Sequence, residues 1–211
     1  QVEKDGGVLI HISTDYVFDG QRPAPEPYIE EDATAPSTFY GVTKLEGEQA
    51  VKISTDRYAI LRTAWLYGCN GGNFLKTMLR LAVNQPDKPL RVVNDQFGTP
   101  TWSHRLALQI EKVIEADGRG IFHASGEGWC SWYDLAAFFL KTMQTPHRIQ
   151  PCSTADYPTP ARRPANSILE NKRLKEQELN VMVPWKQDVD EFVRKYQQRL
   201  IEEVKIKKKT F

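Results

Sequence analysis

Residues 8–20 read VLIHISTDYVFDG, a short apolar run that ends in a cluster of hydroxyl-bearing and acidic residues. The first part, 8–12, is rich in β-branched residues and predicts a strand that is buried on both faces of a sheet. Residues 40–53 have the pattern of a helix, and residues 58–63, YAILRT, predict a second strand. A strand, a helix of roughly 15 residues and another strand form the βαβ unit of a parallel sheet, so the fold class is α/β.

The rest of the chain alternates between helices and short strands. Helical spacing of apolar residues predicts helices at 73–83, 103–116, 131–143 and about 186–204. In the third of these, Trp132 belongs to the apolar face. Short apolar runs predict strands at 90–93 and 120–124. The stretch 145–167 is dominated by proline and polar residues, which predicts an ordered loop or a connection between subdomains.

The composition limits the kinds of partner this protein can have. With 28 Lys and Arg against 27 Asp and Glu, the formal net charge of +1 gives no reason to expect nucleic acid or an anionic membrane as a partner. No apolar run is long enough to span a bilayer. The three cysteines are widely separated, as in proteins of the reducing cytosol. We therefore expect a soluble cytoplasmic protein.

The most informative pair of residues is Tyr40 and Lys44, in the sequence YGVTK. Residues four apart lie on the same face of a helix, so the phenol and the ammonium can point to one site. A tyrosine titrates near pH ~10, and a neighbouring cation lowers the pKa of the phenol toward the range in which it can transfer a proton at neutral pH. The spacing alone is common in helices, and it gains meaning only from its surroundings.

The surroundings are the residues that follow the first strand. Thr14 and Asp15 lie where this strand is expected to end, and open α/β sheets bind their ligands at the carboxyl ends of the strands. Hydroxyls at such a position can also serve only as turn or capping groups. A strand-end threonine, followed by a helix with Tyr40 and Lys44 and by a second parallel strand, is a more specific pattern. It predicts a catalytic Thr–Tyr–Lys triad.

This arrangement resembles the extended short-chain dehydrogenases/reductases, in which a strand-end serine or threonine, a helical tyrosine and a lysine one turn later carry out catalysis. Within that superfamily, the sequence is similar to the family of the dTDP-4-dehydrorhamnose reductases. The similarity runs in family order along nearly the whole chain, in the segments STDYVFDG (13–20), YGVTKLEGE (40–48), LRTAWLYG (61–68), NFLKTMLRLA (73–82), VNDQFGTPTW (93–102) and YPTPARRPANSIL (157–169). The resemblance implies an oxidoreductase that reduces the C4 keto group of dTDP-4-dehydro-L-rhamnose with hydride from NADPH or NADH.

The resemblance also implies a role for each residue of the triad. Tyr40 would donate the proton to the C4 oxygen of the sugar. Lys44 would hydrogen-bond the ribose of the nicotinamide and keep the pKa of Tyr40 low, so both residues would also bind the cofactor. Thr14 would hydrogen-bond the reacting oxygen and so bind the substrate.

Further residues lie at positions that can contact the substrate. Asp15 and Trp65 match family positions that touch it, and the indole of Trp65 could stack on the sugar or the thymine, or could simply anchor the core. Arg163, with Arg162 beside it, could bind the diphosphate through two hydrogen bonds or form a surface salt bridge. Asn73, at the start of a helix, could cap that helix or face the nucleotide, and we favour the cap.

The sequence departs from the family in one large respect. Relatives begin with a strand, a Gly-x-x-Gly-x-x-Gly loop and a helix that receives the cofactor pyrophosphate, and no such pattern occurs here. We therefore expect the C-terminal two-thirds of a family member: a partial Rossmann-type doubly wound parallel sheet in residues 1–68, to which the chain returns around 93–115, and a smaller α/β domain in 69–211 that mainly binds the nucleotide sugar. We also expect this chain alone to bind the nicotinamide cofactor weakly, and it could then be inactive.

Two other functions are compatible with the same motifs. A nucleotide-sugar epimerase or dehydratase shares the triad, and Asp15 partly fits the acidic residue that dehydratases need. A regulatory subunit resembling that of methionine adenosyltransferase keeps the fold and binds nucleotide without catalysis, although it has no need of Trp65. The sequence does not distinguish NADPH from NADH as the cofactor. It also does not show whether the protein forms a homodimer. No residue spacing supports a metal site, including a Mg²⁺ ion at a subunit interface.

The remaining polar candidates have simpler explanations. His11 and His123 lie in predicted strands and are expected to be core residues rather than ligands. The consecutive acidic residues Glu30, Glu31 and Asp32 are expected to form a solvated loop.

Overall fold

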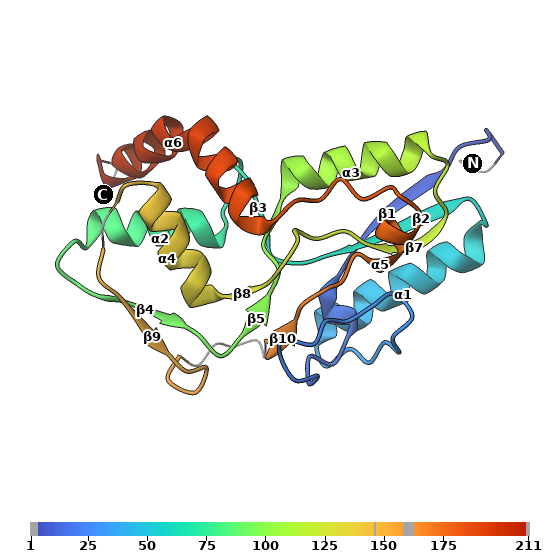
Figure 1. Ribbon diagram of the computed structural model, residues 1–211, viewed down its shortest axis with the longest axis horizontal. Helices are drawn as coiled ribbons and strands as arrows, with labels where there is room; N and C mark the ends of the chain where they lie inside the picture. Colours follow the sequence, from blue (N-terminus) through green and yellow to red (C-terminus); the bar gives the residue numbers. More distant parts are fainter. Residues whose placement is uncertain (1–3, 146, 158–162, 210–211) are drawn as a thin grey trace.

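The computed structural model describes residues 4–145, 147–157 and 163–209, with side chains up to residue 205. The molecule has two lobes, and the chain begins in one lobe and ends in the other (Figure 1). The first lobe is built around a parallel sheet and the second around three helices, while short strands lie between them. This arrangement confirms the α/β fold class.

The central element of the first lobe is a three-stranded parallel sheet in the order β1-β2-β7. β1 spans Leu9–Thr14, β2 spans Tyr58–Thr63 and β7 spans Gly120–His123. Thr14 pairs with Thr63, so β1 and β2 end at the same level. The first two strands and the helix between them form the predicted βαβ unit, and β2 has the predicted bounds.

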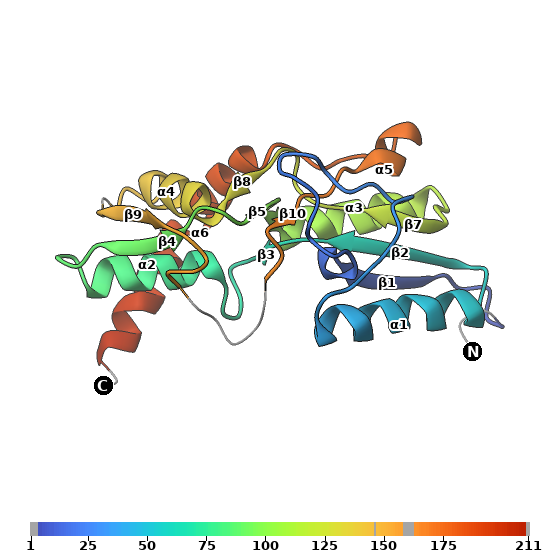
Figure 2. The ribbon, with the colours of Figure 1, turned by 90° about the horizontal axis from the view of Figure 1, so that it is seen from below.

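Helices cover both faces of this sheet (Figure 2). α1, Phe39–Ser54, lies against β1, and the hydroxyl of its capping residue Thr38 accepts a hydrogen bond from the backbone N–H of Gly41 at 3.1 Å. α3, Ser103–Glu115, lies on the other face and is joined there by the short helix α5, Lys172–Glu176. The core on that side is formed by apolar residues of the sheet and these helices: Ala59, Leu61, Leu106, Val113, Phe122, Ala124 and Leu174.

β1 is half-buried along most of its length, which differs from the prediction. Within the part of the chain that the structure describes, β1 pairs with β2 alone. Residues 9–12 are accordingly half-buried, and only Ser13 and Thr14 are buried. The prediction of a strand covered on both faces is therefore wrong for residues 9–12. An apolar composition indicates what a strand is able to bury, whereas its burial depends on the neighbours that it has.

The second lobe is packed around three helices. They are α2 at Phe74–Asn84, α4 at Trp132–Thr142 and α6 at Trp185–Lys209, and they share one core with the parallel strands β4, Leu90–Val93, and β9, Ile149–Cys152. The three helices and β4 lie where the sequence predicts them. β9 lies inside the stretch predicted as a loop. The sequence does not reveal this strand, because its pairing partner is distant in the sequence and a proline occupies one of its positions.

Very short strands lie at the junction of the lobes. In chain order they are β3 (Leu66–Tyr67), β5 (Phe97–Gly98), β6 (Thr101–Trp102), β8 (Cys130–Ser131) and β10 (Asn166–Ser167). β3 pairs with β6, and β5 lies between β8 and β10. Arg105 of α3 adds an ion pair across the junction to Asp188 of α6, at 3.0 Å. The chain thus passes between the lobes repeatedly.

The domain boundary expected after residue 68 stays a prediction. β7, α3 and α5 come later in the sequence, yet they pack with the first lobe. The chain is expected to return to the first domain around 93–115, a range that contains α3 but neither β7 nor α5.

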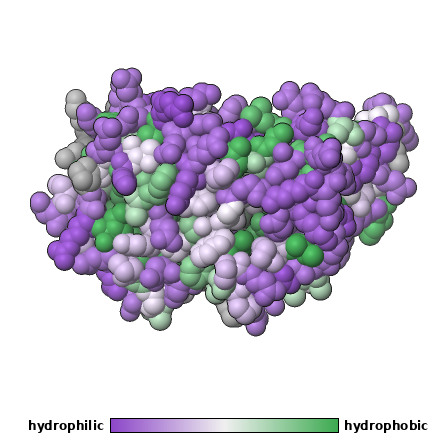
Figure 3. Space-filling model, viewed as in Figure 1, coloured by the Kyte–Doolittle hydropathy of each residue, from purple (hydrophilic) through white to green (hydrophobic). Residues whose placement is uncertain are grey.

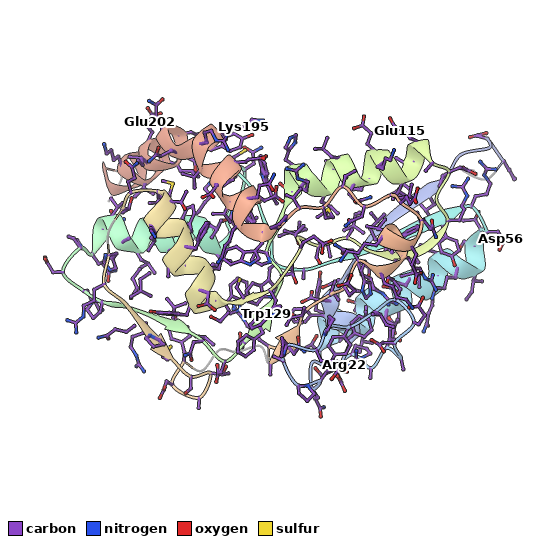
Figure 4. All side chains as sticks on the ribbon, viewed as in Figure 1. Arg22, Asp56, Glu115, Trp129, Lys195 and Glu202 are labelled. Carbon is purple, nitrogen blue, oxygen red and sulfur yellow. The ribbon has the colours of Figure 1, made fainter. Side chains whose placement is uncertain are left out.

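The surface is dominated by polar groups. Figure 3 shows a mostly hydrophilic face on which hydrophobic residues are scattered. Charged side chains such as Glu115, Lys195 and Glu202 point outward from the helices (Figure 4). In the described part of the chain, no helix combines the length and the hydropathy that a membrane span requires.

Candidate active site

A cavity of about 840 Å³ lies at the carboxyl ends of β1 and β2, where the two lobes meet. This volume is within the range of small-molecule binding sites. Its walls come from β1, α1 and the end of β2 on one side, and from α2, α4 and β4 on the other. All six residues that the sequence predicts for catalysis and binding line it: Thr14, Asp15, Tyr40, Lys44, Trp65 and Arg163.

Thr14 and Asp15 are buried at the end of β1, where the chain turns into the short 3-10 helix η1, Asp15–Val17. The Thr14 hydroxyl caps this helix, because its oxygen accepts a hydrogen bond from the backbone N–H of Tyr16 at 3.3 Å. The same hydroxyl donates to Oδ1 of Asp15 at 2.7 Å. Thr14 therefore has the capping role that the sequence allows, and it also lines the cavity.

Burial changes the chemistry of Asp15. The residue is 4% exposed, and this burial raises the pKa of its carboxyl from 3.8 to about 6, although the hydrogen bond from Thr14 acts in the opposite direction. Its second oxygen, Oδ2, accepts no hydrogen bond within 3.5 Å from the described residues, although the hydroxyl of Ser167 lies close enough to the carboxyl to help to lower its pKa. A buried carboxylate oxygen beside a cavity is suited to accept a hydrogen bond from a ligand hydroxyl.

Replacing Asp15 by asparagine tests the effect of this burial on stability. Because the pKa is raised in the fold, the stability that comes from the neutral carboxyl is fully present below the ordinary value of 3.8 and is lost as the pH rises through about 6. The interval between 3.8 and about 6 corresponds to about 3 kcal/mol at most. We compare the free energy of unfolding of Asp15→Asn with that of the wild type at about pH 4 and at about pH 7. From the lower to the higher pH, this difference should change in favour of the variant by up to that amount.

Urea unfolding at both pH values measures this gain. Asp56→Asn provides the control for an aspartate-to-asparagine change, since Asp56 lies exposed between α1 and β2 (Figure 4). An effect of Asp15→Asn that is the same at both pH values would contradict the prediction.

Tyr40 and Lys44 lie on the side of α1 that borders the cavity. Tyr40 is 53% exposed, and its ring packs edge-to-face against Tyr16 with ring centroids 5.6 Å apart. The ammonium of Lys44 donates a hydrogen bond to the backbone carbonyl of Ile12, near the end of β1, at 2.5 Å. The spacing of four residues thus has the predicted effect, because one helix face supplies both groups to one cavity.

Gly41 allows the first turn of α1 to approach η1 closely. A Cβ at this position would lie 2.2 Å from the backbone oxygen of Tyr16 and 2.9 Å from Cβ of Pro36. A side chain there would require the backbone to move, because the nearest atom belongs to the main chain. The glycine after Tyr40 therefore keeps that tyrosine next to the end of β1.

Farther along α1, a buried ion pair fixes the helix to the sheet. The carboxylate of Glu48 accepts two hydrogen bonds from Arg62 of β2, at 2.9 and 2.7 Å, and one from the hydroxyl of Ser13 at 2.5 Å. Burial alone would raise the pKa of Glu48, but the hydrogen bonds and the charge of Arg62 outweigh it and lower the pKa below its ordinary value. Since Ser13 precedes Thr14, the pair links α1 to the strand end that borders the cavity.

Trp65 follows β2 with a φ angle of +47°, in the left-handed region that bulky residues rarely adopt. Its indole N–H donates to the hydroxyl of Ser167 at 3.1 Å, and a Cβ on Gly98 would lie 2.4 Å from Cε2 of the indole. One face of the indole is stacked on Trp132, with ring centroids 3.4 Å apart and an angle of 7° between the planes. That face is therefore not free to stack on a sugar or a base.

Two arginines border the same cavity. Arg163 is exposed and lines the cavity, whereas its neighbour Arg162 lies outside the described residues. Arg91 of β4 also lines the cavity, and its guanidinium lies 3.7 Å from the carboxylate of Asp156. Guanidinium groups bind phosphate oxygens through paired hydrogen bonds, so each of these two arginines is suited to bind an anionic group of a ligand.

Some residues of the cavity were not predicted. Trp132, Phe74 and Tyr157 line it, and the first two also pack against the core of the second lobe. Trp132 and Phe74 each begin a helix, directly after the capping residues Ser131 and Asn73. Both helices begin at the junction of the lobes, and for Phe74 the predicted cap at Asn73 was the available signal for a helix start.

Asn73 has the structural role that we favoured. Its side-chain oxygen accepts a hydrogen bond from the backbone N–H of Lys76 at 3.1 Å, which confirms the cap of α2. Among the described residues, no three His, Cys, Asp or Glu side chains are grouped as a metal site would require.

The two strand histidines and the acidic loop lie away from the cavity. His123 is fully buried, and this burial, followed by the charge of Arg62, lowers its pKa to about 3, as expected of a core residue. Burial also lowers the pKa of His11. The prediction of a solvated acidic loop is wrong for Glu30, which is 5% exposed. Its carboxylate accepts hydrogen bonds from the backbone N–H groups of His123 and Arg173, at 2.9 and 3.2 Å.

Comparison of the sequence with known proteins gives a family and named relatives. Residues 1–198 match the family described as the RmlD substrate binding domain. The chain is 41% identical over 188 residues to a dTDP-4-dehydrorhamnose reductase of Burkholderia thailandensis, in a match that covers 81% of this chain and 62% of that protein. The chain thus spans less than two thirds of the length of this relative.

Comparison of the fold with solved structures also finds dTDP-4-dehydrorhamnose reductases. The crystal structure of a dTDP-4-dehydrorhamnose reductase from Clostridium acetobutylicum superposes with a TM-score of 0.88 at 42% identity, covering 93% of this chain and 68% of that one. The dTDP-4-dehydrorhamnose reductase of Bacillus anthracis, solved in complex with NADP, superposes with a TM-score of 0.85 at 38% identity, covering 90% and 66%.

Proposed function

This chain belongs to the family of the RmlD substrate binding domain, and on that premise we propose that it acts as a nicotinamide-dependent reductase of a nucleotide sugar. The proposed reaction reduces the C4 keto group of dTDP-4-dehydro-L-rhamnose and gives dTDP-L-rhamnose. The observation that carries the proposal is the shared cavity of Thr14, Tyr40 and Lys44 at the carboxyl ends of parallel strands. The activity named for the relatives supports it.

Tyr40 is the proposed proton donor. It borders the cavity, and Lys44 lies one turn later with its ammonium at the end of β1. A cation at this position stabilises the phenolate that remains after the transfer, so it favours donation of the proton to the C4 oxygen. Thr14 is proposed to hold that oxygen by a hydrogen bond. Its hydroxyl must then turn away from Asp15, to which it donates in the structure.

The cavity fits the reactive end of a nicotinamide cofactor. NADPH or NADH supplies the hydride that is added to C4, and the NADP complex of a relative supports this part of the proposal. Tyr40 and Lys44 are the proposed contacts to the nicotinamide ribose, because a phenol and an ammonium can both hydrogen-bond its hydroxyls.

The remaining predicted residues are proposed to bind the nucleotide sugar. The unpartnered oxygen of Asp15 would accept a hydrogen bond from a sugar hydroxyl. Arg163, together with Arg91, would bind the diphosphate. Trp65 would contact the sugar as part of the cavity wall, since one of its faces is already covered by Trp132.

Turnover by the purified chain tests the proposal. We expect dTDP-4-dehydro-L-rhamnose to cause loss of NADPH absorbance, at NADPH concentrations high enough to offset weak binding. Calorimetric titration with dTDP-L-rhamnose tests binding of the nucleotide sugar separately. Binding of the nucleotide sugar without turnover at NADPH concentrations that saturate the chain would favour the non-catalytic, regulatory function over the reductase. Absence of both would contradict the proposal as a whole.

A cytoplasmic location is part of the proposal. Cys69, Cys130 and Cys152 are all free, so the fold as described uses none of its cysteines in a disulfide. This supports a reducing compartment, in which disulfides are rare.

A further inference from the structure

Three aromatic side chains from three separate elements form one wall of the cavity. Trp65 follows β2, Trp132 begins α4 and Phe74 begins α2, and all three line the cavity. Trp132 contacts both of the others, with ring centroids 3.4 Å from Trp65 and 4.6 Å from Phe74. We call Trp65, Trp132 and Phe74 the aromatic wall.

The aromatic wall is held by its surroundings. The indole N–H of Trp65 is bound to the hydroxyl of Ser167 at 3.1 Å. Trp132 follows Ser131, which forms a capping box with Asp134 and so fixes the start of α4. Ring positions that are fixed before a ligand arrives allow a cavity to distinguish between ligands of similar shape.

The aromatic wall stands beside the residues proposed to act on the sugar. Trp65 lies two residues after Thr63, which pairs with Thr14 across β1 and β2. If Thr14 and Tyr40 act on C4 as proposed, the part of the substrate nearest to the wall would be the sugar around C4 rather than the base. In a 6-deoxy sugar, one neighbour of C4 carries a hydroxyl, and the other neighbour, C5, carries the apolar C6 methyl group.

We propose that Trp132 is a specificity-determining residue: by covering Trp65 it completes an apolar wall that accepts the C6 methyl group of a 6-deoxy sugar and disfavours a C6 hydroxyl. This inference rests on the proposed function and adds the feature of the sugar that is selected. A hydroxyl against the ring faces of the wall would lose water without gaining a strong acceptor or donor, because a ring face offers neither and the N–H of Trp65 is already bound to Ser167. Asp15, with its unpartnered oxygen, supplies the polar side for the hydroxyl on the other neighbour of C4.

Two ligands that differ by one oxygen atom test the proposal. dTDP-L-mannose is dTDP-L-rhamnose with a hydroxyl on C6, so the ratio of their dissociation constants isolates that group. For the wild-type chain we expect dTDP-L-rhamnose to bind about 10- to 100-fold more tightly, the range expected when an apolar pocket meets an added hydroxyl. Calorimetric titration measures both constants.

Substitution of Trp132 decides whether the aromatic wall causes this preference. In Trp132→Ala, water can reach the C6 position, and we expect the ratio to fall toward one. Trp132→Phe keeps an apolar ring and should retain most of the preference. If Trp132→Ala does not fold, Phe74→Leu removes the other ring that contacts Trp132 and should lower the same ratio.

Each alternative outcome has a definite meaning. A purely structural role of Trp132 would weaken both ligands alike, so an unchanged ratio in Trp132→Ala overturns the inference. Equal binding of both ligands by the wild type also overturns it, while the proposed function stands. Failure of the wild type to bind either ligand contradicts the proposed function, and the inference fails with it.

Trp129→Ala is the matched control for loss of an indole. Trp129 is 44% exposed, does not line the cavity and packs edge-to-face against Phe97 (Figure 4). This variant should keep the wild-type ratio. Circular dichroism provides a second readout, because Trp132→Ala should remove the signal of two stacked indoles and Trp129→Ala should not.

Discussion

Replacing Tyr40 by phenylalanine is expected to lower turnover of dTDP-4-dehydro-L-rhamnose by about 10²- to 10⁴-fold. The aromatic ring remains, and with it the edge-to-face contact with Tyr16, so the variant lacks only the hydroxyl that would carry the proton. Because Tyr40 is 53% exposed, the stability of the fold should hardly change. The rate of NADPH oxidation measures the loss, and titration with dTDP-L-rhamnose checks that the nucleotide sugar still binds.

Tyr58→Phe is the matched control. Tyr58 begins β2, at the opposite end of the strand from the cavity, and its replacement by phenylalanine removes the same hydroxyl group. Its turnover should equal that of the wild type. If Tyr40→Phe kept more than about a tenth of the activity, some other group would have to supply the proton.

The largest loss of stability is expected from Glu48→Ala. Glu48 is fully buried and Arg62 is 2% exposed, so the substitution leaves a guanidinium without a counter-charge inside the fold. We expect a loss of about 3–5 kcal/mol in the free energy of unfolding. A typical domain is stabilised by only about 5–15 kcal/mol, so this loss is large enough to unfold part of the population. Urea unfolding followed by circular dichroism measures it.

Removal of both charges separates the effect of the charge from that of volume. Glu48→Leu combined with Arg62→Met replaces the ion pair by apolar side chains and is expected to recover most of the lost stability. A double variant as unstable as Glu48→Ala would instead assign the loss to packing around α1. Since the pKa of Glu48 is lowered in the fold, the contribution of the pair is present above the ordinary value of 4.5 and is lost as the pH falls through the lowered value.

The sequence predicts the features of this fold that depend on neighbouring residues. The helix that carries Tyr40 and Lys44 follows from local periodicity, and β2 from a short apolar run. Thr14 could be assigned to the same site because parallel strands end at one edge of their sheet. Trp65 and Arg163 could be added only through the resemblance to a family, since nothing in their local pattern points to the cavity.

Features that depend on distant partners could not be predicted. The strands at the junction of the lobes are two residues long, too short to show a period in the sequence. Glu30 is buried because backbone N–H groups from far along the chain meet its carboxylate. Trp132 packs against the core as its spacing predicts, but its place at the first position of the helix also brings it to the cavity, which the spacing does not show.

The repeated passage of the chain between the lobes has a consequence for ligand exchange. A hinge requires that a few residues absorb the rotation of one body against another. Here the short strand pairs β3–β6 and β10–β5–β8, with the ion pair of Arg105 and Asp188, would all have to break or shear together. We therefore expect the two lobes to move as one body, so that a ligand would enter and leave past cavity-lining side chains such as the exposed Tyr157. On this expectation no closing step lowers the fraction of binding-competent molecules, and a measured dissociation constant would equal the intrinsic affinity of the preformed site.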